Sequence, residues 1–201
     1  FKVQVTLNKN LPIASGMAGG SSNAATFILC VKEIFGLKII KGFDSLLLSL
    51  GADVPFCFSR KTALVSGIGE KITFIKKLKE YYILLVNPQI EVSTREIFSD
   101  LVFSEEKENK NLNNNITNSF IKKSNDLEHL AVKKYKIIGE ILLHLSNCHG
   151  VVINRMTGSG ATCFALFENS YDLNRAEFFT KNTFKNCWIK KAKLVNSVKH
   201  I

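Results

Sequence analysis

A glycine-rich segment, PIASGMAGGSSNAA at residues 12–25, constrains the fold of this chain more than any other feature. It lies between an apolar alternating run and an alanine-rich run with helical spacing. Glycines at the mouth of a helix remove the Cβ atoms that would keep an anion away, and they permit positive φ. The first N–H groups of a helix have no intrahelical partner and carry a partial positive charge. The segment therefore predicts a loop whose backbone can contact a polyphosphate.

The residues around these glycines narrow the kind of phosphate site. Ser21 and Ser22 stand at the predicted helix start, where they can cap the helix, donate to phosphate oxygens or help to hold Mg²⁺. No Gly-Lys-Ser/Thr closes the segment, so it is not a Walker A loop, and the G-x-G-x-x-G spacing of a dinucleotide site is absent. A flexible loop before an ordinary helix cap is the alternative, and this segment by itself leaves both open.

Cysteine and histidine usage predicts no metal-ligating residues. The five cysteines are scattered without a C-x-x-C pair, which favours reduced thiols and a cytoplasmic location over disulfides or zinc. The four histidines include no i,i+4 pair beside a glutamate of the metalloprotease type. No apolar run approaches the ~18 residues that span a bilayer, so we expect no membrane partner.

The net charge of +10 is compatible with nucleic acid, an anionic ligand or a solvated lysine-rich surface. The lysines come mostly as short pairs without interleaved aromatic residues or an RNA-binding motif. We therefore expect no nucleic-acid partner.

Periodicity and turn residues predict an alternation of helices and strands. Helices are expected at 21–35, 42–49, 93–101, 126–146 and 171–181, and strands at 1–7, 55–58, 62–66, 70–75, 81–88, 150–154, 162–167 and 187–194. Without regular parallel β-α-β spacing, this order favours an α+β fold in two lobes, 1–78 and 79–201. The polar, Asn-rich segment 104–119 is expected to be a mobile insertion. The first residues alternate like a strand and contain no initiating Met, so we expect a preceding segment.

Three further places offer chemistry from the residues alone. Asp53, in GADVPF, is either a turn residue or a loop carboxylate placed for acid–base work. TGSGA, at 157–161, is either a tight turn between strands or a second glycine loop. Thr94 and Phe98 are one helical turn apart, so one helix face presents a hydroxyl and a ring; an ordinary capped helix with a core Phe is the alternative.

LPIASGMAGGSSNAA resembles the P-x-x-x-G-L-G-S-S-A phosphate-binding motif of the GHMP kinase superfamily. Five later blocks resemble, in order and at fitting spacing, the branch of that superfamily that phosphorylates diphosphocytidyl-methylerythritol in non-mevalonate isoprenoid synthesis. They are LGADVPFCF, VSGIGEKI, NPQIEVSTREIF, SNDLE and MTGSGATCFALF. Together the blocks cover nearly the whole chain and imply a two-lobed GHMP kinase that uses ATP and Mg²⁺.

The resemblance assigns roles to particular residues. It implies Asp53 as the catalytic acid–base residue, Thr94, Phe98, Gly158, Ser159 and Gly160 beside the substrate, and an ATP-binding segment that consists of Pro12, Ile13, Ala14, Ser15, Gly16, Met17, Ala18, Gly19, Gly20, Ser21 and Ser22. Phe98 is expected to stack on the cytosine. Lys9 either reaches the nucleotide or is a solvated surface lysine.

The chain departs from the superfamily pattern at two points. Met17-Ala18 stands where Leu-Gly is usual, so Ala18 must accept whatever φ the loop needs. The opening strand of the superfamily, with its Ala-Lys-hydrophobic-Asn motif and catalytic lysine, has no counterpart. Three alternatives follow: another small-molecule kinase acting on mevalonate, homoserine or a sugar, an inactive remnant that binds nucleotide or a partner, and a basic RNA-binding protein.

Overall fold

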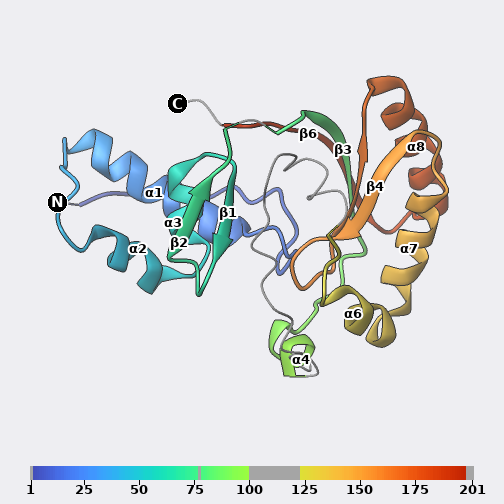
Figure 1. The fold of residues 1–201 in the computed structure, drawn as a ribbon, viewed down its shortest axis with the longest axis horizontal. Helices are drawn as coiled ribbons and strands as arrows, with labels where there is room; N and C mark the ends of the chain where they lie inside the picture. The colour runs from blue at the N-terminus through green and yellow to red at the C-terminus, as the bar shows by residue number, and fades with distance from the viewer. Residues whose placement is uncertain (1, 77, 100–122, 198–201) are drawn as a thin grey trace.

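The computed structural model describes residues 2–76, 78–99 and 123–197, and Figure 1 shows how the elements are arranged. Along the chain these are α1 (Gly19–Ile34), α2 (Phe43–Leu50), α3 (Val54–Ser59), β1 (Ala63–Ser66), β2 (Lys71–Phe74), β3 (Tyr81–Asn87), α4 (Thr94–Ser99), α6 (Glu128–Lys134), α7 (Lys136–Ser146), β4 (Val151–Met156), β5 (Cys163–Phe167), α8 (Ser170–Thr183) and β6 (Trp188–Leu194). No helix among these residues is long and apolar enough to cross a membrane.

An antiparallel sheet with strand order β4-β5-β3-β6 organises the second part of the chain. Helices α7 and α8 lie along one face of it, and α1–α3 lie at the other end of the molecule together with the β1–β2 hairpin (Figure 1). Helices beside antiparallel sheets are the mark of the α+β class, so the predicted fold class is confirmed.

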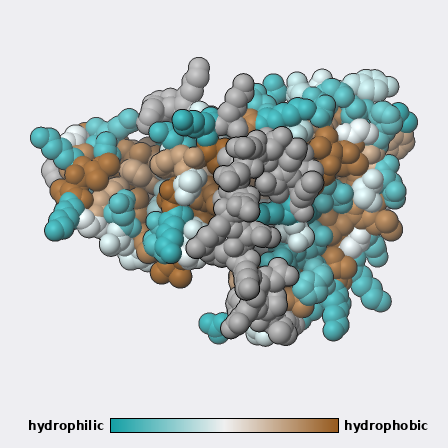
Figure 2. Space-filling model, viewed as in Figure 1, coloured by the Kyte–Doolittle hydropathy of each residue, from teal (hydrophilic) through white to brown (hydrophobic). Residues whose placement is uncertain are grey.

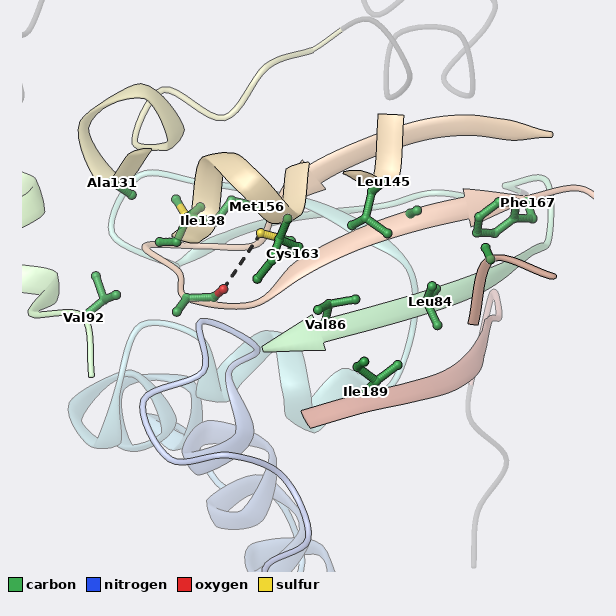
Figure 3. Close-up of a cluster of buried hydrophobic side chains, with 14 of the residues drawn as sticks. Leu84, Val86, Val92, Ala131, Ile138, Leu145, Met156, Cys163, Phe167 and Ile189 are labelled. Carbon is green, nitrogen blue, oxygen red and sulfur yellow. Dashed lines mark hydrogen bonds between the residues drawn. The ribbon is translucent and has the colours of Figure 1, made fainter. Parts of the chain in front are cut away.

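Alternation along the strands builds the main core. Leu84 and Val86 of β3, and Cys163, Ala165 and Phe167 of β5, are fully buried. They pack against apolar side chains of α7 and α8, among them Ile138, Ile141, Leu145, Leu173 and Ala176. Figure 3 shows this cluster between the sheet and its helices. The sheet therefore gives the end of β4 and the start of β5 a rigid support.

A second, much smaller cluster holds α1, α2 and α3 together. Its fully buried members are Ala25, Leu47 and Val54. Apolar side chains remain exposed on the same helices, for example Phe27, Ile34 and Leu46, and brown surface is visible at this end of the molecule in Figure 2. Two separate clusters support a division near residues 76–81, which stays a prediction.

The two parts are joined by hydrogen bonds as well as by the chain itself. Thr62 donates from its backbone N to Asn196 O at 3.0 Å, and its Oγ1 donates to the same oxygen at 3.0 Å. Asn196 Nδ2 donates to Leu78 O at 2.9 Å, and Leu78 N donates to Asn196 Oδ1. The residues that follow β6 therefore fasten the start of β1 to the start of β3.

Two predicted strands are wrong. Residues 2–10 are extended without strand pairing and are exposed, because none of the described strands lies beside them to accept their backbone hydrogen bonds. Residues 55–58 belong to α3, not to a strand. Pro55 lies in the first turn of that helix, where its fixed φ and missing N–H favour helix formation, and Asp53 is the N-cap residue.

The predicted helix 126–146 is two helices. Tyr135, with φ −126° and ψ 87°, ends α6 and precedes α7. After the break, α6 packs against α7. A Cβ placed on Gly139 of α7 would lie only 3.0 Å from Val132 Cγ1 of α6. The other predicted helices and strands are confirmed within a few residues, except that α1 begins at Gly19 rather than residue 21. The predicted insertion 104–119 lies outside the described residues.

Candidate functional site

The N-terminus of α1 is a helix end without a side-chain cap. Its N-cap residue is Ala18, no side chain accepts a hydrogen bond there, and the first turn contains no acidic residue. The predicted capping by Ser21 or Ser22 is therefore wrong, because both serines lie inside the helix. The first helical bond from this pair runs from Ser22 N to Ala18 O at 2.9 Å. The first-turn N–H groups thus remain available to an anion.

The space in front of this helix end is open. A Cβ on Gly20 would meet nothing within 4 Å, and one on Gly19 would meet only Leu11 Cδ1, at 3.7 Å. Neither glycine is required by the packing of the protein around it. Their absent side chains instead leave the helix end uncovered, which is what close approach of a phosphate group needs.

Ala18 adopts the left-handed conformation, with φ 49° and ψ 29°. The alanine that stands in place of the usual glycine of the superfamily therefore adopts a conformation that glycine reaches more easily. A residue with a Cβ loses ~1–2 kcal/mol in this region.

We expect Ala18→Gly to leave the free energy of unfolding unchanged or to raise it by up to about 1 kcal/mol, since relief of strain offsets the greater entropy of glycine in the unfolded chain. Ala24→Gly, inside α1, is the matched control and should lower it by ~1 kcal/mol. Chemical denaturation measures both values. Equal destabilisation by the two variants would contradict the strain at Ala18.

The two glycine loops contact each other across 141 residues of sequence. Thr157 Oγ1 donates to Gly16 O at 3.0 Å. Gly16 has φ +68°, and a Cβ there would lie 2.3 Å from Thr157 O and 2.7 Å from Gly160 O. A Cβ on Gly158 would in turn lie 2.8 Å from Gly16 O. The two backbones approach so closely that only glycine fits at these positions.

The predicted substrate residues lie beside the second loop. Thr94 Oγ1 and Ser159 Oγ are 2.9 Å apart and share a hydrogen bond. Ser93 Oγ accepts from Glu96 N at 3.3 Å, so the predicted cap of this helix is present. Phe98 is exposed and lines a cavity of about 490 Å³ together with Gly158. The structure therefore brings α4 and the second glycine loop to one cavity.

The cavity combines an aromatic lining with two opposite charges. Phe164 lines it beside Phe98, and Arg155 and Asp126 contribute the charges. Burial lowers the pKa of the Arg155 guanidinium below its ordinary value, and the nearby Glu128 carboxylate opposes that shift. Rings with a guanidinium beside them suit a planar ligand that carries negative charge.

Asp53 takes no part in the contacts between the loops. It is exposed at the N-terminus of α3 and is followed by the buried Val54. Burial, and then the charge of Asp53, raise the pKa of the Cys57 thiol one turn along the helix. The chain just before Asp53 approaches α1, since a Cβ on Gly51 would lie 3.8 Å from Ser21 Oγ. Lys9 is exposed in the extended segment before the loop.

Two contributors to the site were missed by the sequence patterns. Thr157 connects the loops, and Asn125 donates to the backbone of the second loop. Both lie in blocks that were noticed, TGSGA and SNDLE, but neither block shows which side chain reaches which carbonyl. Such contacts join residues far apart in sequence, so no local spacing could have revealed them.

Comparison with known proteins gives one family match and many relatives of one name. Residues 1–61 match the family described as "GHMP kinases N terminal domain". A 4-diphosphocytidyl-2-C-methyl-D-erythritol kinase from Geobacter sulfurreducens is 37% identical over 170 residues, which is 83% of this chain and 61% of that protein. One from Clostridium novyi is 33% identical over 196 residues, which is 93% of this chain and 70% of that protein.

Solved structures agree on the fold. A crystal structure of 4-(cytidine 5'-diphospho)-2C-methyl-D-erythritol kinase matches with a TM-score of 0.74 at 23% identity, over 91% of this chain and 68% of that one. A homoserine kinase from Cytophaga hutchinsonii matches with a TM-score of 0.66 at 14% identity, over 94% and 68%. The chain spans 61% of the length of the first two curated relatives that it matches.

Proposed function

The chain belongs to the 4-diphosphocytidyl-2-C-methyl-D-erythritol kinase family, and we propose that it transfers the γ-phosphoryl group of ATP to the 2-hydroxyl of that diphosphocytidyl compound. The observation that carries the proposal is the uncapped start of α1, held against a second glycine loop that borders an aromatic cavity. One loop is suited to a polyphosphate and the cavity to the acceptor. We place the reaction in the cytoplasm, in a monomer or weak homodimer.

The segment from Pro12 to Ser22 would hold the triphosphate. The open space before Gly19 and Gly20 and the unoccupied first-turn N–H groups of α1 fit phosphate oxygens. Because phosphoryl transfer depends chiefly on positioning and charge stabilisation, a fixed row of N–H donors is a large part of what the reaction needs. Lys9 is near enough in sequence to add a positive charge.

Mg²⁺ fits this site only with help from the phosphates. The described residues contain no group of three or more His, Cys, Asp or Glu side chains that could enclose a metal ion. Mg²⁺ is ordinarily held by one or two carboxylates together with substrate phosphates. With the phosphates as its main ligands, the hydroxyls of Ser21 and Ser22 would help to hold it beside ATP. The ion would neutralise phosphate charge.

The acceptor would lie against the second loop and α4. Thr94 and Ser159, already bonded to each other, offer hydroxyls for a diphosphate or polyol, and the exposed ring of Phe98 offers a stacking surface for the cytosine. Arg155 would balance the negative charge of the diphosphate. The backbone of Gly158, Ser159 and Gly160 would contact the substrate, since Gly158 lines the cavity.

Asp53 would accept the proton of the attacking hydroxyl. As the hydroxyl oxygen forms its bond to the γ-phosphorus, the bond from that phosphorus to the β,γ-bridging oxygen breaks, and ADP leaves with the bonding electrons. The hydroxyl proton passes to the Asp53 carboxylate and then to solvent. The products are ADP and the 2-phosphorylated acceptor, so atoms and charge balance.

The proposal is tested first by nucleotide binding to the Gly19→Val variant. A branched side chain at Gly19 would enter the space assigned to the phosphates, so we expect ATP affinity to fall at least about tenfold, or ~1.4 kcal/mol. The nearest protein atom, Leu11 Cδ1, is at ordinary contact distance from a Cβ there, so the variant should fold. Isothermal titration calorimetry measures the affinity.

Substrate choice is tested by ADP release with different acceptors. Turnover with the diphosphocytidyl compound, but not with mevalonate, homoserine or a sugar, is the expected result. Cys30→Val, at an exposed position further along α1, gives a control for a branched residue placed away from the loop. Unchanged affinity in folded Gly19→Val would overturn the phosphate site. Nucleotide binding without turnover of any acceptor would favour the inactive remnant.

A further inference from the structure

The end of strand β4 is held by two side chains from the turn that begins α6. Asn125 Nδ2 donates to Met156 O at 2.9 Å and to Gly158 O at 2.8 Å. Glu128 Oε2 accepts from Met156 N at 2.7 Å. Both polar groups of Met156 and the carbonyl of Gly158 are thus fixed from outside the sheet. We call Asn125 and Glu128 the β4 clamp.

The β4 clamp is itself fixed by its own turn. Asn125 Oδ1 accepts from Leu127 N at 3.0 Å, and Asn125 O accepts from Glu128 N at 3.0 Å. The oxygen of the side-chain amide therefore accepts from the start of α6, and its nitrogen donates to the end of β4 and to the second glycine loop. An amide whose oxygen and nitrogen both have hydrogen-bond partners is held in one orientation. It therefore fixes the backbone groups to which it donates.

The second glycine loop in turn contacts the loop before α1, residues 12–18, which we call the phosphate loop. Thr157 N donates to Thr162 O at 2.9 Å, and Gly160 N donates to Thr157 O at 3.0 Å, which closes the loop on itself. Thr157 Oγ1 then donates to Gly16 O, two residues before the N-cap of α1. Hydrogen bonds and short stretches of chain therefore connect Asn125 to Gly16, just before the start of α1.

We propose that Asn125, which also lines the cavity assigned to the acceptor, is a positioning residue: it sets the place of the phosphate loop through the second glycine loop without touching ATP. The effect on ATP binding rests on the proposed function. The effect on the position of the loop does not, because the hydrogen bonds exist without ligand. The β4 clamp belongs to the part with the large core, whereas the phosphate loop belongs to the part with the small one. The rigid part thereby orders the site in the other.

Asn125→Asp separates positioning from the formation of α6. The new carboxylate keeps an oxygen for Leu127 N but loses both N–H donors to the loop. Hydrogen exchange in the free protein is read at the amides of Gly160 and Ser22, which donate to Thr157 O and Ala18 O. We expect exchange at both to accelerate at least about tenfold, since two hydrogen bonds to the loop are lost. ATP affinity should fall by a similar factor.

Asn154→Asp is the matched control. Asn154 Nδ2 donates to Leu142 O at 2.9 Å, so the same substitution, made within β4 itself, removes a hydrogen bond away from both loops. It should lower the melting temperature and leave exchange at Gly160 and Ser22 as in the unaltered protein. If the two variants lose similar stability and neither accelerates exchange at Ser22, Asn125 is merely structural and the proposal is overturned.

Thr157 tests the same path if Asn125→Asp does not fold. Thr157→Val keeps the shape but removes the hydroxyl bonded to Gly16 O, so exchange at Ser22 should accelerate, and Thr157→Ser should restore it. Unaccelerated exchange in folded Thr157→Val would overturn the proposal. If the unaltered protein binds no ATP, the proposed function fails, while the exchange measurements still decide the inference.

Discussion

Replacing Asp53 with Asn is expected to lower the turnover rate by about 10²–10⁴-fold, because general-base catalysis typically contributes that much. The amide keeps the size of the side chain and can still orient a hydroxyl, but it cannot accept a proton. Since Asp53 is exposed at the N-cap of α3, outside the contacts that join the two loops, the fold and the binding of ATP should change little. The loss should therefore appear in kcat.

The assay follows ADP release with the diphosphocytidyl acceptor, using the protein as its gene encodes it. Asp44→Asn is the matched control, since Asp44 is also an exposed carboxylate near the start of a helix, in the first turn of α2, and should keep full activity. If Asp53→Asn keeps more than about a third of the rate, far above the range for a lost base, Asp53 is a turn residue only.

Gly16→Ala is expected to separate the two glycine loops and to destabilise the protein by about 2–5 kcal/mol, the sum of left-handed strain and overpacking. A Cβ at Gly16 would lie 2.3 Å from Thr157 O, which is backbone and has no rotamer to escape into. The loops must therefore move apart and break the hydrogen bond between Thr157 and Gly16. Chemical denaturation and ATP titration measure the two losses.

Gly20→Ala is the control within the same motif. Gly20 is helical, and a Cβ there would meet nothing within 4 Å, so the variant should gain about 0.5–1 kcal/mol of stability from helix propensity. Opposite signs for the two glycines are the expected result. A stable Gly16→Ala variant with normal ATP affinity would show that the close approach of the loops is unnecessary.

Local patterns were sufficient where a single element determines its own structure. The glycines and alanines around residue 20 predicted a helix after a loop, and α1 follows such a loop. Short apolar runs predicted β3 and β5, whose buried side chains form the core. Each of these depends on neighbours in sequence, which the pattern contains.

Sequence patterns gave the wrong result, or none, where the structure of a segment depends on contacts with residues far away in the sequence. Residues 55–58 are apolar and aromatic enough for a strand, but Pro55 in the first helical turn and the packing of Val54 on α1 favour a helix. The break at Tyr135 leaves helical spacing intact on both sides, so periodicity could not reveal it. The contact between Gly16 and Thr157 joins two loops from opposite parts of the chain. Only the assembled fold contains that information.

Unequal cores make the two parts of the molecule respond differently to a bound nucleotide. The phosphate loop begins a helix that rests on three fully buried apolar residues, whereas the acceptor cavity borders the large core of the sheet. A ligand present at 100 times its dissociation constant stabilises the state that binds it by ~2.7 kcal/mol. This free energy is large compared with what the small cluster contributes to stability, and small compared with what the large core contributes. A bound nucleotide would therefore contribute much of the stability of α1–α3, whereas the acceptor would bind to a site that is already folded without it.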